Sequence, residues 1–349
     1  MSTPSDQREP IFDIAEFSSF ELFSPDVDGT LWFFKDLLGM IETARSGDSV
    51  FLRGWHDPYN HSLKVTHRDH AGMGSAGWRA TSKPALERRV KAVQETGRGR
   101  GWVEGECGVG DAFEFTLPDG SVQRIHWDVD YYRAPEDQRG VLRNRPQSRP
   151  LAGVPVESLD HLNLLAKNVT DNKEFFAEAL GFRLTEHIIF GDVEAGAWMR
   201  LNTRSHDVAF TKDASGRGGR LHHVAFHYGN AQHLEDACDV LTDRGLELEA
   251  GPARHGISRA QFVYVLEPGG NRIELVGNPA YTIKDPSWEP VRWEQDTLDS
   301  AIIWYGSPLP KEFDTYGTPN YDPTEYRTAN RHPRAHADDY IAAEASLLL

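Results

Sequence analysis

Two histidines and one glutamate in the second half of the chain have the residue types of a metal site. His161, His223 and Glu274 each lie in a short strand-like run, at 159–164, 221–226 and 271–276. Two imidazoles and one carboxylate fill about half of an octahedral shell and leave neighbouring positions open. This ligand set is typical of Fe(II) sites that bind an organic substrate and O₂ together. It therefore indicates a reaction class as well as a fold.

The residues alone leave the second ligand open. His222 and His223 are neighbours in their run. Successive side chains of a strand point to opposite faces, so only one of the two is expected to face a cavity. Strand geometry does not say which.

The segments around these residues predict a repeated order of strand, helix and further strands. Helices are expected at about 170–180, capped by Thr170 or Asp171, and at 231–244. Gly181 and Gly245 are expected to end them. One face of the second helix is apolar: Leu234, Ala237, Cys238 and Leu241. The expected strands are 158–165, 183–189, 195–201, 206–211, 221–228, 246–250, 260–266 and 271–276.

The two halves of the chain resemble each other. Residues 24–39 align without a gap on 166–181 and share a valine, a Phe-Phe pair and a Leu-Gly ending. Such self-similarity implies two copies of one domain. We predict an α+β fold of two tandem domains, each made of paired βαβββ modules with sheets curled around a cavity. The expected parts are an N-terminal domain (1–140), a linker (141–157) in a Pro-, Arg- and Gln-rich stretch, a catalytic domain (158–306) and an extension (307–349).

The N-terminal copy lacks the metal ligands. Carried across the repeat, the three positions are expected at Ser19, at Ser75 or its neighbours, and at Arg124 or, in a shifted register, His126. The N-terminal domain is therefore expected to act as a scaffold or interface.

Composition excludes several classes of protein. Of 349 residues, 39% are apolar and 26% are charged, and no apolar stretch approaches the ~20 residues of a membrane span. A net charge of -16 argues against nucleic acid and anionic membranes as partners. With two cysteines, Cys107 and Cys238, neither a disulfide scaffold nor a Cys-rich zinc site is expected. The N-terminus lacks the apolar core of a secretory signal, so we expect a cytoplasmic protein.

Six segments of the C-terminal half carry a resemblance to a known family, in the family's order and near its spacing. They are Leu159–Asn163, Ala197–Arg200, Ser205–Phe210, Arg220–Phe226, Gly251–Gly256 and Tyr264–Glu274. In these segments the chain resembles the type I extradiol catechol dioxygenases of the vicinal oxygen chelate superfamily. The resemblance assigns His223, and not His222, to the metal with His161 and Glu274. The N-terminal half matches only in general architecture.

The resemblance implies roles for further side chains. His206 matches the acid–base histidine beside the O₂ position, and His255 and Tyr264 match the pair that holds the substrate's hydroxylate side. Asn163 shares a strand face with His161 and is expected to line the pocket. Trp198 is expected either to wall the aromatic ring or to pack in the core.

The implied reaction inserts both atoms of O₂ into a catechol next to one hydroxyl. This 2,3-cleavage gives a product of the 2-hydroxymuconic-semialdehyde type. The implied cofactor is Fe(II), with Mn(II) as the alternative, and the implied assembly is a homo-oligomer such as a tetramer. Rival functions are a glyoxalase-like or fosfomycin-modifying enzyme, disfavoured by His206, His255 and Tyr264, and a bleomycin-resistance-type binding protein, disfavoured by the intact metal set.

Substrate charge is also addressed by the resemblance. Relatives specialised for homoprotocatechuate hold its carboxylate with arginines. This chain has Ala250 and Ser300 at those places, and the 298–305 segment looks closer to the catechol 2,3-dioxygenase branch. We expect an uncharged catechol, plain or alkyl-substituted. A homoprotocatechuate-type enzyme is the alternative, because Arg254 or Arg292 could supply the missing charge.

Overall fold

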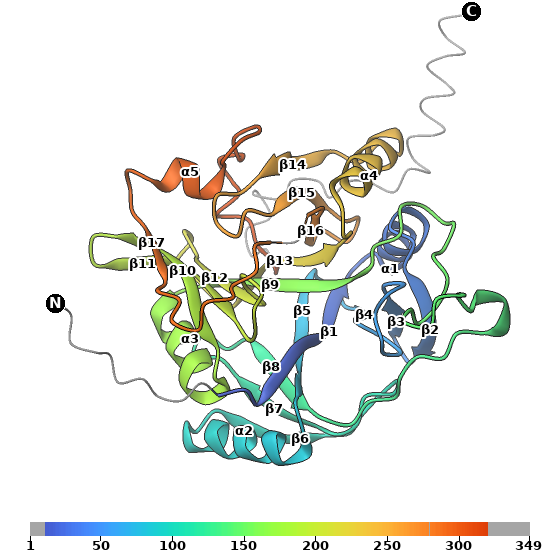
Figure 1. Cartoon of the computed structure of the whole chain (residues 1–349), viewed down its shortest axis with the longest axis horizontal. Coiled ribbons are helices and arrows are strands. Elements are labelled where there is room, and N and C mark those ends of the chain that lie inside the picture. Colours follow the sequence, from blue (N-terminus) through green and yellow to red (C-terminus); the bar gives the residue numbers. More distant parts are fainter. Residues whose placement is uncertain (1–10, 279, 320–349) are drawn as a thin grey trace, which may run out of the picture.

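The computed structural model describes residues 11–278 and 280–319, and its described residues form two large mixed β-sheets (Figure 1). The first sheet has eight strands in the order β2-β3-β4-β1-β5-β8-β7-β6. Its strands are β1 Ile14–Ser24, β2 Ile41–Ser46, β3 Ser49–Arg53, β4 Leu63–His67, β5 Gly72–Ala80, β6 Gly99–Val103, β7 Ala112–Thr116 and β8 Val122–His126.

The second sheet has nine strands in the order β14-β15-β16-β13-β9-β12-β11-β10-β17. Its strands are β9 Ser158–Ala166, β10 Arg183–Phe190, β11 Val193–Arg200, β12 Val208–Lys212, β13 Arg220–His227, β14 Leu248–Arg254, β15 Gln261–Leu266, β16 Arg272–Val276 and β17 Val291–Trp293. Apart from β17, the order repeats that of the first sheet. In both, the first strand pairs parallel with the fourth and antiparallel with the fifth. The predicted α+β duplication is confirmed.

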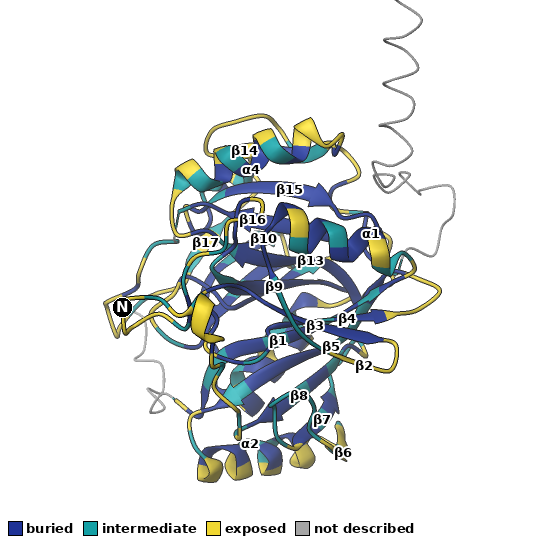
Figure 2. Ribbon diagram, turned by 90° about the vertical axis from the view of Figure 1, so that its right-hand side faces the viewer, coloured by how far each residue is buried: buried dark blue, intermediate teal, exposed yellow. Residues whose placement is uncertain are grey.

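The helices lie on the outside of the sheets or between them. They are α1 Val27–Trp32 with its π-helical continuation η1 Phe33–Leu37, α2 Lys83–Glu95, the 3-10 turn η2 Glu136–Gln138, α3 Val169–Phe175 with its π-helical continuation η3 Phe176–Leu180, α4 Ala231–Asp243 and α5 Leu298–Ile302. Figure 2 shows buried strands and an exposed outer face on α2. The buried face of α4 consists of the four predicted residues, Leu234, Ala237, Cys238 and Leu241.

The first helix of each half reaches the sheet of the other half. The ring of Phe34 in η1 lies 5.5 Å from that of Phe226 in β13. Reciprocally, the ring of Phe176 in η3 lies 5.6 Å from that of Trp78 in β5. One continuous cluster of buried apolar residues therefore spans both halves.

The helix ends agree with those predicted from the sequence, except for one N-terminal cap. Gly181 and Gly245 adopt left-handed backbone angles, with φ of 84° and 75°, where the helices end. The expected cap at Thr170 or Asp171 was wrong. The side chain of Asn168 caps α3 by accepting a hydrogen bond from the backbone N–H of Thr170, because α3 starts one residue earlier than predicted.

The described part of the C-terminal extension packs on the second sheet. Thr318 pairs with Leu221 of β13, and the guanidinium of Arg220 donates to the carbonyl oxygens of Thr315 and Gly317. The expected helical stretch at 337–347 lies outside the described residues. Where one domain ends and the next begins stays a prediction.

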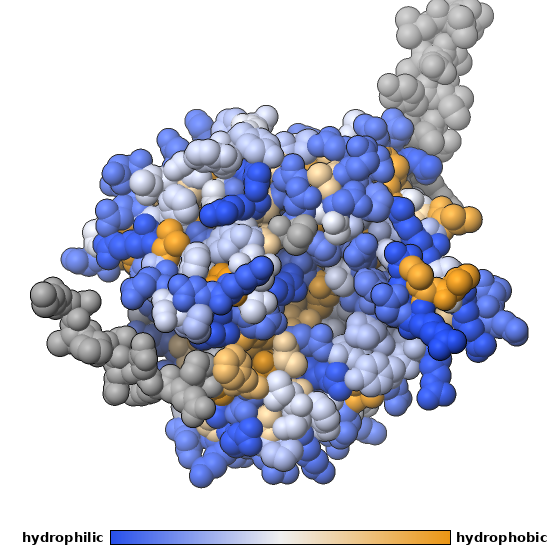
Figure 3. Space-filling model, in the orientation of Figure 1, coloured by the Kyte–Doolittle hydropathy of each residue, from blue (hydrophilic) through white to orange (hydrophobic). Residues whose placement is uncertain are grey.

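The face shown in Figure 3 is mostly hydrophilic, and hydrophobic residues appear on it in small separate groups. Among the described residues, none of the helices combines the length and apolarity needed to cross a bilayer.

Candidate active site

Three adjacent strands bring His161, His223 and Glu274 together. They lie on β9, β13 and β16, which are neighbours in the second sheet. The Nε2 atoms of the two histidines are 3.2 Å apart. Oε2 of Glu274 lies 2.8 Å from Nε2 of His161 and 3.0 Å from Nε2 of His223. The three residues are buried, and their ligand atoms all lie within 4.8 Å of one another.

The donor chemistry of this cluster fits a divalent metal ion. Nδ1 of His161 lies 2.7 Å from Oδ1 of Asp160, so Nδ1 carries the proton and the lone pair of Nε2 faces the cluster. Oε2 of Glu274 is buried and accepts no hydrogen bond within the described part of the chain. The two Nε2 atoms and Oε2 thus face one another, and a divalent cation between them would satisfy all three.

The electrostatics of the cluster also favour a bound cation. Burial lowers the pKa of His161, but the carboxylates of Glu274 and Asp160 outweigh it and raise that pKa to about 9. Burial raises the pKa of Glu274, but the two histidines hold it well below 4.5. The site therefore favours positive charge strongly.

All eight side chains singled out from the sequence line one cavity of about 330 Å³. They are His161, Asn163, Trp198, His206, His223, His255, Tyr264 and Glu274. The cavity thus has a polar end at the three-residue cluster.

His206 lies directly beside the cluster. Its ring centroid is 4.3 Å from that of His161, and its Nδ1 is 3.0 Å from the Ser205 hydroxyl. Burial, with the nearby His161, lowers the pKa of His206 well below its usual value. The imidazole is therefore neutral, and one of its ring nitrogens keeps a lone pair.

His255 and Tyr264 form a hydrogen-bonded pair on the other side of the cluster. Nε2 of His255 lies 3.2 Å from the Tyr264 hydroxyl and 3.8 Å from Oε1 of Glu274. Tyr264 pairs directly with Glu274 across β15 and β16. Burial and the Glu274 carboxylate raise the pKa of Tyr264 well above its usual value, so its hydroxyl keeps its proton.

The expectation that only one of His222 and His223 faces the cavity was wrong. The rings are 4.9 Å apart and both residues line the cavity. The pairing of β13 with β9 shifts register between Leu221 and His223, and such a bulge breaks the alternation of faces. His223 alone of the two belongs to the three-residue cluster.

Comparison with known proteins identifies the family. Residues 158–275 match the family described as Glyoxalase/Bleomycin resistance protein/Dioxygenase superfamily. The chain is 44% identical over 313 residues to a metapyrocatechase of Geobacillus stearothermophilus, covering 89% of this chain and 96% of that protein. The chain belongs to the extradiol dioxygenases. The expected enzyme class is thereby confirmed over the glyoxalase-like and binding-protein alternatives.

Other relatives of this extradiol dioxygenase cover most of its length. A manganese-dependent 2,3-dihydroxybiphenyl 1,2-dioxygenase of Geobacillus genomosp. 3 is 35% identical, covering 84% of this chain and 94% of the relative. The crystal structure of homoprotocatechuate 2,3-dioxygenase from Arthrobacter globiformis superposes with a TM-score of 0.76 at 26% identity, covering 88% and 92%. Extradiol dioxygenases use Fe(II) or Mn(II), and the three-residue cluster fits either ion.

Sequence reasoning missed the apolar wall of the dioxygenase cavity. Ile188 and Phe190 of β10, Leu298, Ala301 and Ile302 of α5, and Leu309 and Phe313 of the extension form much of it. These segments are far apart in sequence, and β17 and α5 were not predicted. Isolated apolar residues in loops and short elements carry no periodic signal that could have revealed the wall.

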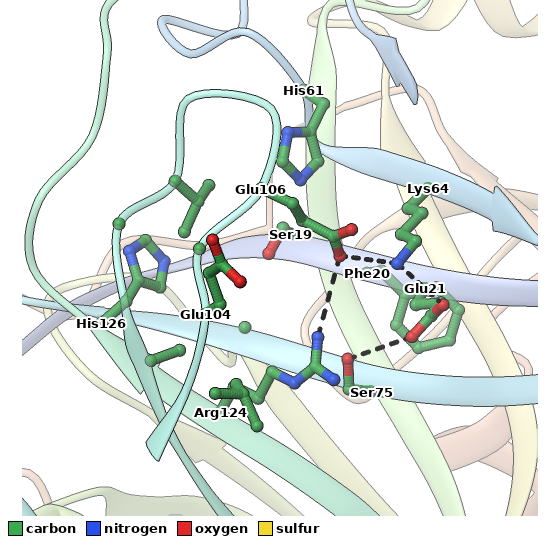
Figure 4. Close-up of a pocket in the computed structure, with 16 residues that line it drawn as sticks. Ser19, Phe20, Glu21, His61, Lys64, Ser75, Glu104, Glu106, Arg124 and His126 are labelled. Atoms are coloured by element: carbon green, nitrogen blue, oxygen red, sulfur yellow. Dashed lines mark hydrogen bonds and ion pairs between the residues drawn. The ribbon is translucent and has the colours of Figure 1, made fainter. Parts of the chain in front are cut away.

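The N-terminal half of the dioxygenase holds the duplicate of this site, a small pocket of about 40 Å³ (Figure 4). The pairing of Gly77 with Arg124 matches that of Ala225 with Glu274, so Arg124, not His126, occupies the glutamate position.

The strand registers of the two sheets also show which residues are equivalent. Ser19, Ser75 and His61 occupy the positions that His161, His223 and His206 occupy in the second sheet. The correspondence of His61 with His206 was not predicted. This correspondence depends on how the first and fourth strands of each sheet pair, and the sequence alone does not give that register.

Ion pairs fill the N-terminal pocket. Nζ of Lys64 lies 2.6 Å from Glu106 and 3.2 Å from Glu21, and Arg124 lies 3.9 Å from Glu106. In Figure 4, Glu106 lies between the two cations. The side chains of Lys64 and Arg124 thus provide cationic partners for Glu21 and Glu106 in this pocket.

Proposed function

We propose that this extradiol dioxygenase cleaves uncharged catechols next to one hydroxyl, with its metal held by His161, His223 and Glu274. The observation that carries the proposal is the convergence of these three ligands, within 4.8 Å, at one end of a cavity that also contains His206, His255 and Tyr264. The product proposed is a ring-opened semialdehyde of the 2-hydroxymuconic type.

Fe(II) or Mn(II), when bound, would supply a centre at which catechol and O₂ meet and through which electron density passes between them. The protein's part is to orient the substrate and move protons. The His255–Tyr264 pair is placed to hold the hydroxylate side of the catechol. Asn163, hydrogen-bonded to Thr211 at 3.1 Å, presents an amide beside the cluster. Trp198 supplies a flat wall for the ring.

His206 is proposed as the acid–base residue. Its neutral imidazole accepts a proton from the catechol, donates to the reduced oxygen as negative charge develops there, and returns the proton later. Burial keeps bulk water from competing for these hydrogen bonds.

The charge of the cavity supports an uncharged substrate. Among the described residues that line it, Lys212 is the only lysine or arginine, and its Nζ donates at 2.7 Å to the carbonyl oxygen of Lys167. Arg254 and Arg292 do not line the cavity and bond elsewhere, to Arg259 and Glu294. Asp314 lines the cavity and would repel a carboxylate.

The apolar wall supports alkyl substituents on the ring. Aliphatic and aromatic side chains stabilise such groups by burying them, at roughly 0.8 kcal/mol per methylene.

The experiment is a comparison of kcat/KM for catechol, 4-methylcatechol and homoprotocatechuate with the metal-loaded enzyme, followed by the yellow colour of the product. We expect the two uncharged catechols to be preferred by at least about tenfold, since the cavity lacks a partner for a carboxylate. A preference for homoprotocatechuate would overturn the substrate proposal. Ring-opening that persists at full rate in Glu274→Ala would overturn the ligand proposal.

Three further features are part of the proposal. The resident metal is Fe(II), with Mn(II) as the alternative, which metal analysis of the isolated protein distinguishes. The chain acts in the cytoplasm on catechol and O₂, without nucleic acid or membrane partners, as its charge of -16 suggests. A homo-oligomer such as a tetramer is proposed from the family resemblance, and light scattering tests it.

A further inference from the structure

A buried carboxylate without a cationic hydrogen-bond partner lies behind the apolar wall of the cavity. Glu186 of β10 is 2% exposed. It shares a strand face with Ile188, which lines the cavity. A buried glutamate in apolar surroundings is costly unless its oxygens are hydrogen-bonded, so its partners indicate what it stabilises.

Three donors from three separate segments meet on this carboxylate. Oε1 accepts from the backbone N–H of Ser258 at 2.7 Å and from the hydroxyl of Tyr281 at 2.8 Å. Oε2 accepts from the indole N–H of Trp293 at 2.8 Å. Ser258 lies in the loop between β14 and β15, whereas Trp293 ends β17.

Two of these segments lead directly to His255. The loop that contains Ser258 begins at His255, and Ser258 and Arg259 have left-handed φ angles of 58° and 60°. Non-glycine residues rarely adopt such angles, so the loop needs external bonds to keep this shape.

The segment that contains Trp293 also leads to His255. The chain runs from Trp293 of β17 into α5, whose last residues hold the loop. The carbonyl oxygen of Ala301 accepts from the N–H groups of Gly256 and Ile257 at 3.0 and 2.8 Å. That of Ile302 accepts from Nδ1 of His255 at 2.5 Å.

We propose that Glu186 is a positioning residue for the substrate-binding side of the active site. It fastens the 256–260 loop and the β17–α5 segment to the same point of β10, and so sets where His255 and α5 meet. This inference rests on the role proposed for His255. Glu186 does not itself line the cavity and contacts neither the substrate nor the metal.

An uncharged isostere cannot replace this carboxylate. In Glu186→Gln, one amide oxygen can accept from Ser258 and Tyr281, but the amide NH₂ then faces the N–H of Trp293. Trp293→Phe removes that opposing donor. The double variant E186Q/W293F is therefore expected to behave like W293F alone, because the new amide no longer opposes a donor.

The matched control is Glu194→Gln. Glu194 is a buried carboxylate on the neighbouring strand β11, and it also accepts three hydrogen bonds, here from the side chains of Thr170, Lys173 and His187. None of these partners belongs to the His255 loop or to the β17–α5 segment. The Glu194→Gln variant therefore reports the general cost of neutralising a buried carboxylate in this sheet.

The experiment measures kcat, KM for catechol, metal content and thermal midpoint in each variant. We expect E186Q to raise KM about tenfold at nearly unchanged metal content, because a displaced His255 binds the substrate less well. E194Q should change KM less than about twofold. E186Q/W293F should return KM to within about threefold of W293F alone.

Two results would overturn the proposal: a KM for E186Q no higher than that of E194Q, or a KM for E186Q/W293F far above that of W293F. If E186Q does not fold, Trp293→Phe carries the same test, because it removes the bond to the β17–α5 segment and keeps the carboxylate. A raised KM then supports the proposal and an unchanged KM overturns it. His255→Ala is measured in parallel. An unchanged KM in H255A refutes the role of His255, whereas a raised KM in H255A with wild-type behaviour of E186Q refutes only the role of Glu186.

Discussion

Nδ1 of His255 lies 2.5 Å from the backbone carbonyl oxygen of Ile302, the last residue of α5. A carbonyl oxygen only accepts, so the imidazole donates there and its Nε2 carries a lone pair. That lone pair is 3.2 Å from the Tyr264 hydroxyl, which donates to it. A backbone atom of a short helix thus selects the tautomer of a side chain proposed to bind substrate.

This relationship predicts different outcomes for two substitutions of His255. Asn can still donate to Ile302 through its amide but cannot reach Tyr264, so His255→Asn should lower kcat/KM about 100-fold with a nearly unchanged thermal midpoint. His255→Leu loses both bonds and should also be less stable. Steady-state kinetics and thermal denaturation test this. Equal stability of the two variants would show that the bond to Ile302 is unimportant.

Metal content should be one ion per chain. The described residues contain one cluster suited to a metal, and the duplicate pocket is filled by Lys64 and Arg124. Elemental analysis of wild-type enzyme and of Glu274→Ala tests this, with the latter expected to lose metal and ring cleavage together. Glu106→Gln, in the duplicate pocket, is the control and should keep its metal. Two ions per chain would contradict the prediction.

His206→Asn should keep the metal but slow the reaction. The side chain of His206 contacts the cluster without belonging to it. Removing an acid–base group costs about 100-fold or more in kcat. The measurement is kcat at matched metal occupancy. A variant with full activity would leave His206 as a packing residue only.

Asp213→Asn should destabilise the protein in a pH-dependent manner. Asp213 pairs at 2.8 Å with the buried Arg220, which also bonds the described extension. Leaving that guanidinium without its partner costs about 3–5 kcal/mol. Burial opposes ionisation, but hydrogen bonds from Arg220 and Ser215 lower the pKa of Asp213 to about 2.

The sign of the pH dependence follows from this lowered pKa. The stabilisation is fully present above the unfolded value of 3.8 and is lost as the pH falls towards 2. Denaturant titrations of wild type and D213N should therefore differ most near pH 7 and converge in acid. Glu294→Gln, at an exposed pair, is the control and should cost less than about 0.5 kcal/mol at any pH. A constant difference between wild type and D213N would contradict the assignment.

Regular, repeated features were predictable from the sequence. The strands that hold His161, His223 and Glu274 have clear apolar patterns, and Gly181 and Gly245 end their helices as expected. The duplication was visible because both copies keep the Phe-Phe pair, which packs in the shared core.

What could not be predicted depends on local irregularity or long-range contact. The bulge beside His222 has no signature in the residues, so alternation gave a wrong expectation there. The register that makes Arg124 equivalent to Glu274 is a property of paired strands, not of either strand alone. Glu186 is one acidic residue in a polar sequence until the fold brings Ser258, Tyr281 and Trp293 to it.

The crossed contacts of Phe34 and Phe176 have a consequence for how the gene can be divided. Each half contributes a phenylalanine that packs on the sheet of the other half. Cutting the chain at the linker would therefore remove part of the hydrophobic core of both pieces. The half without metal ligands is thus as necessary to the folded active site as the half with them. Neither piece alone is expected to fold into an active enzyme.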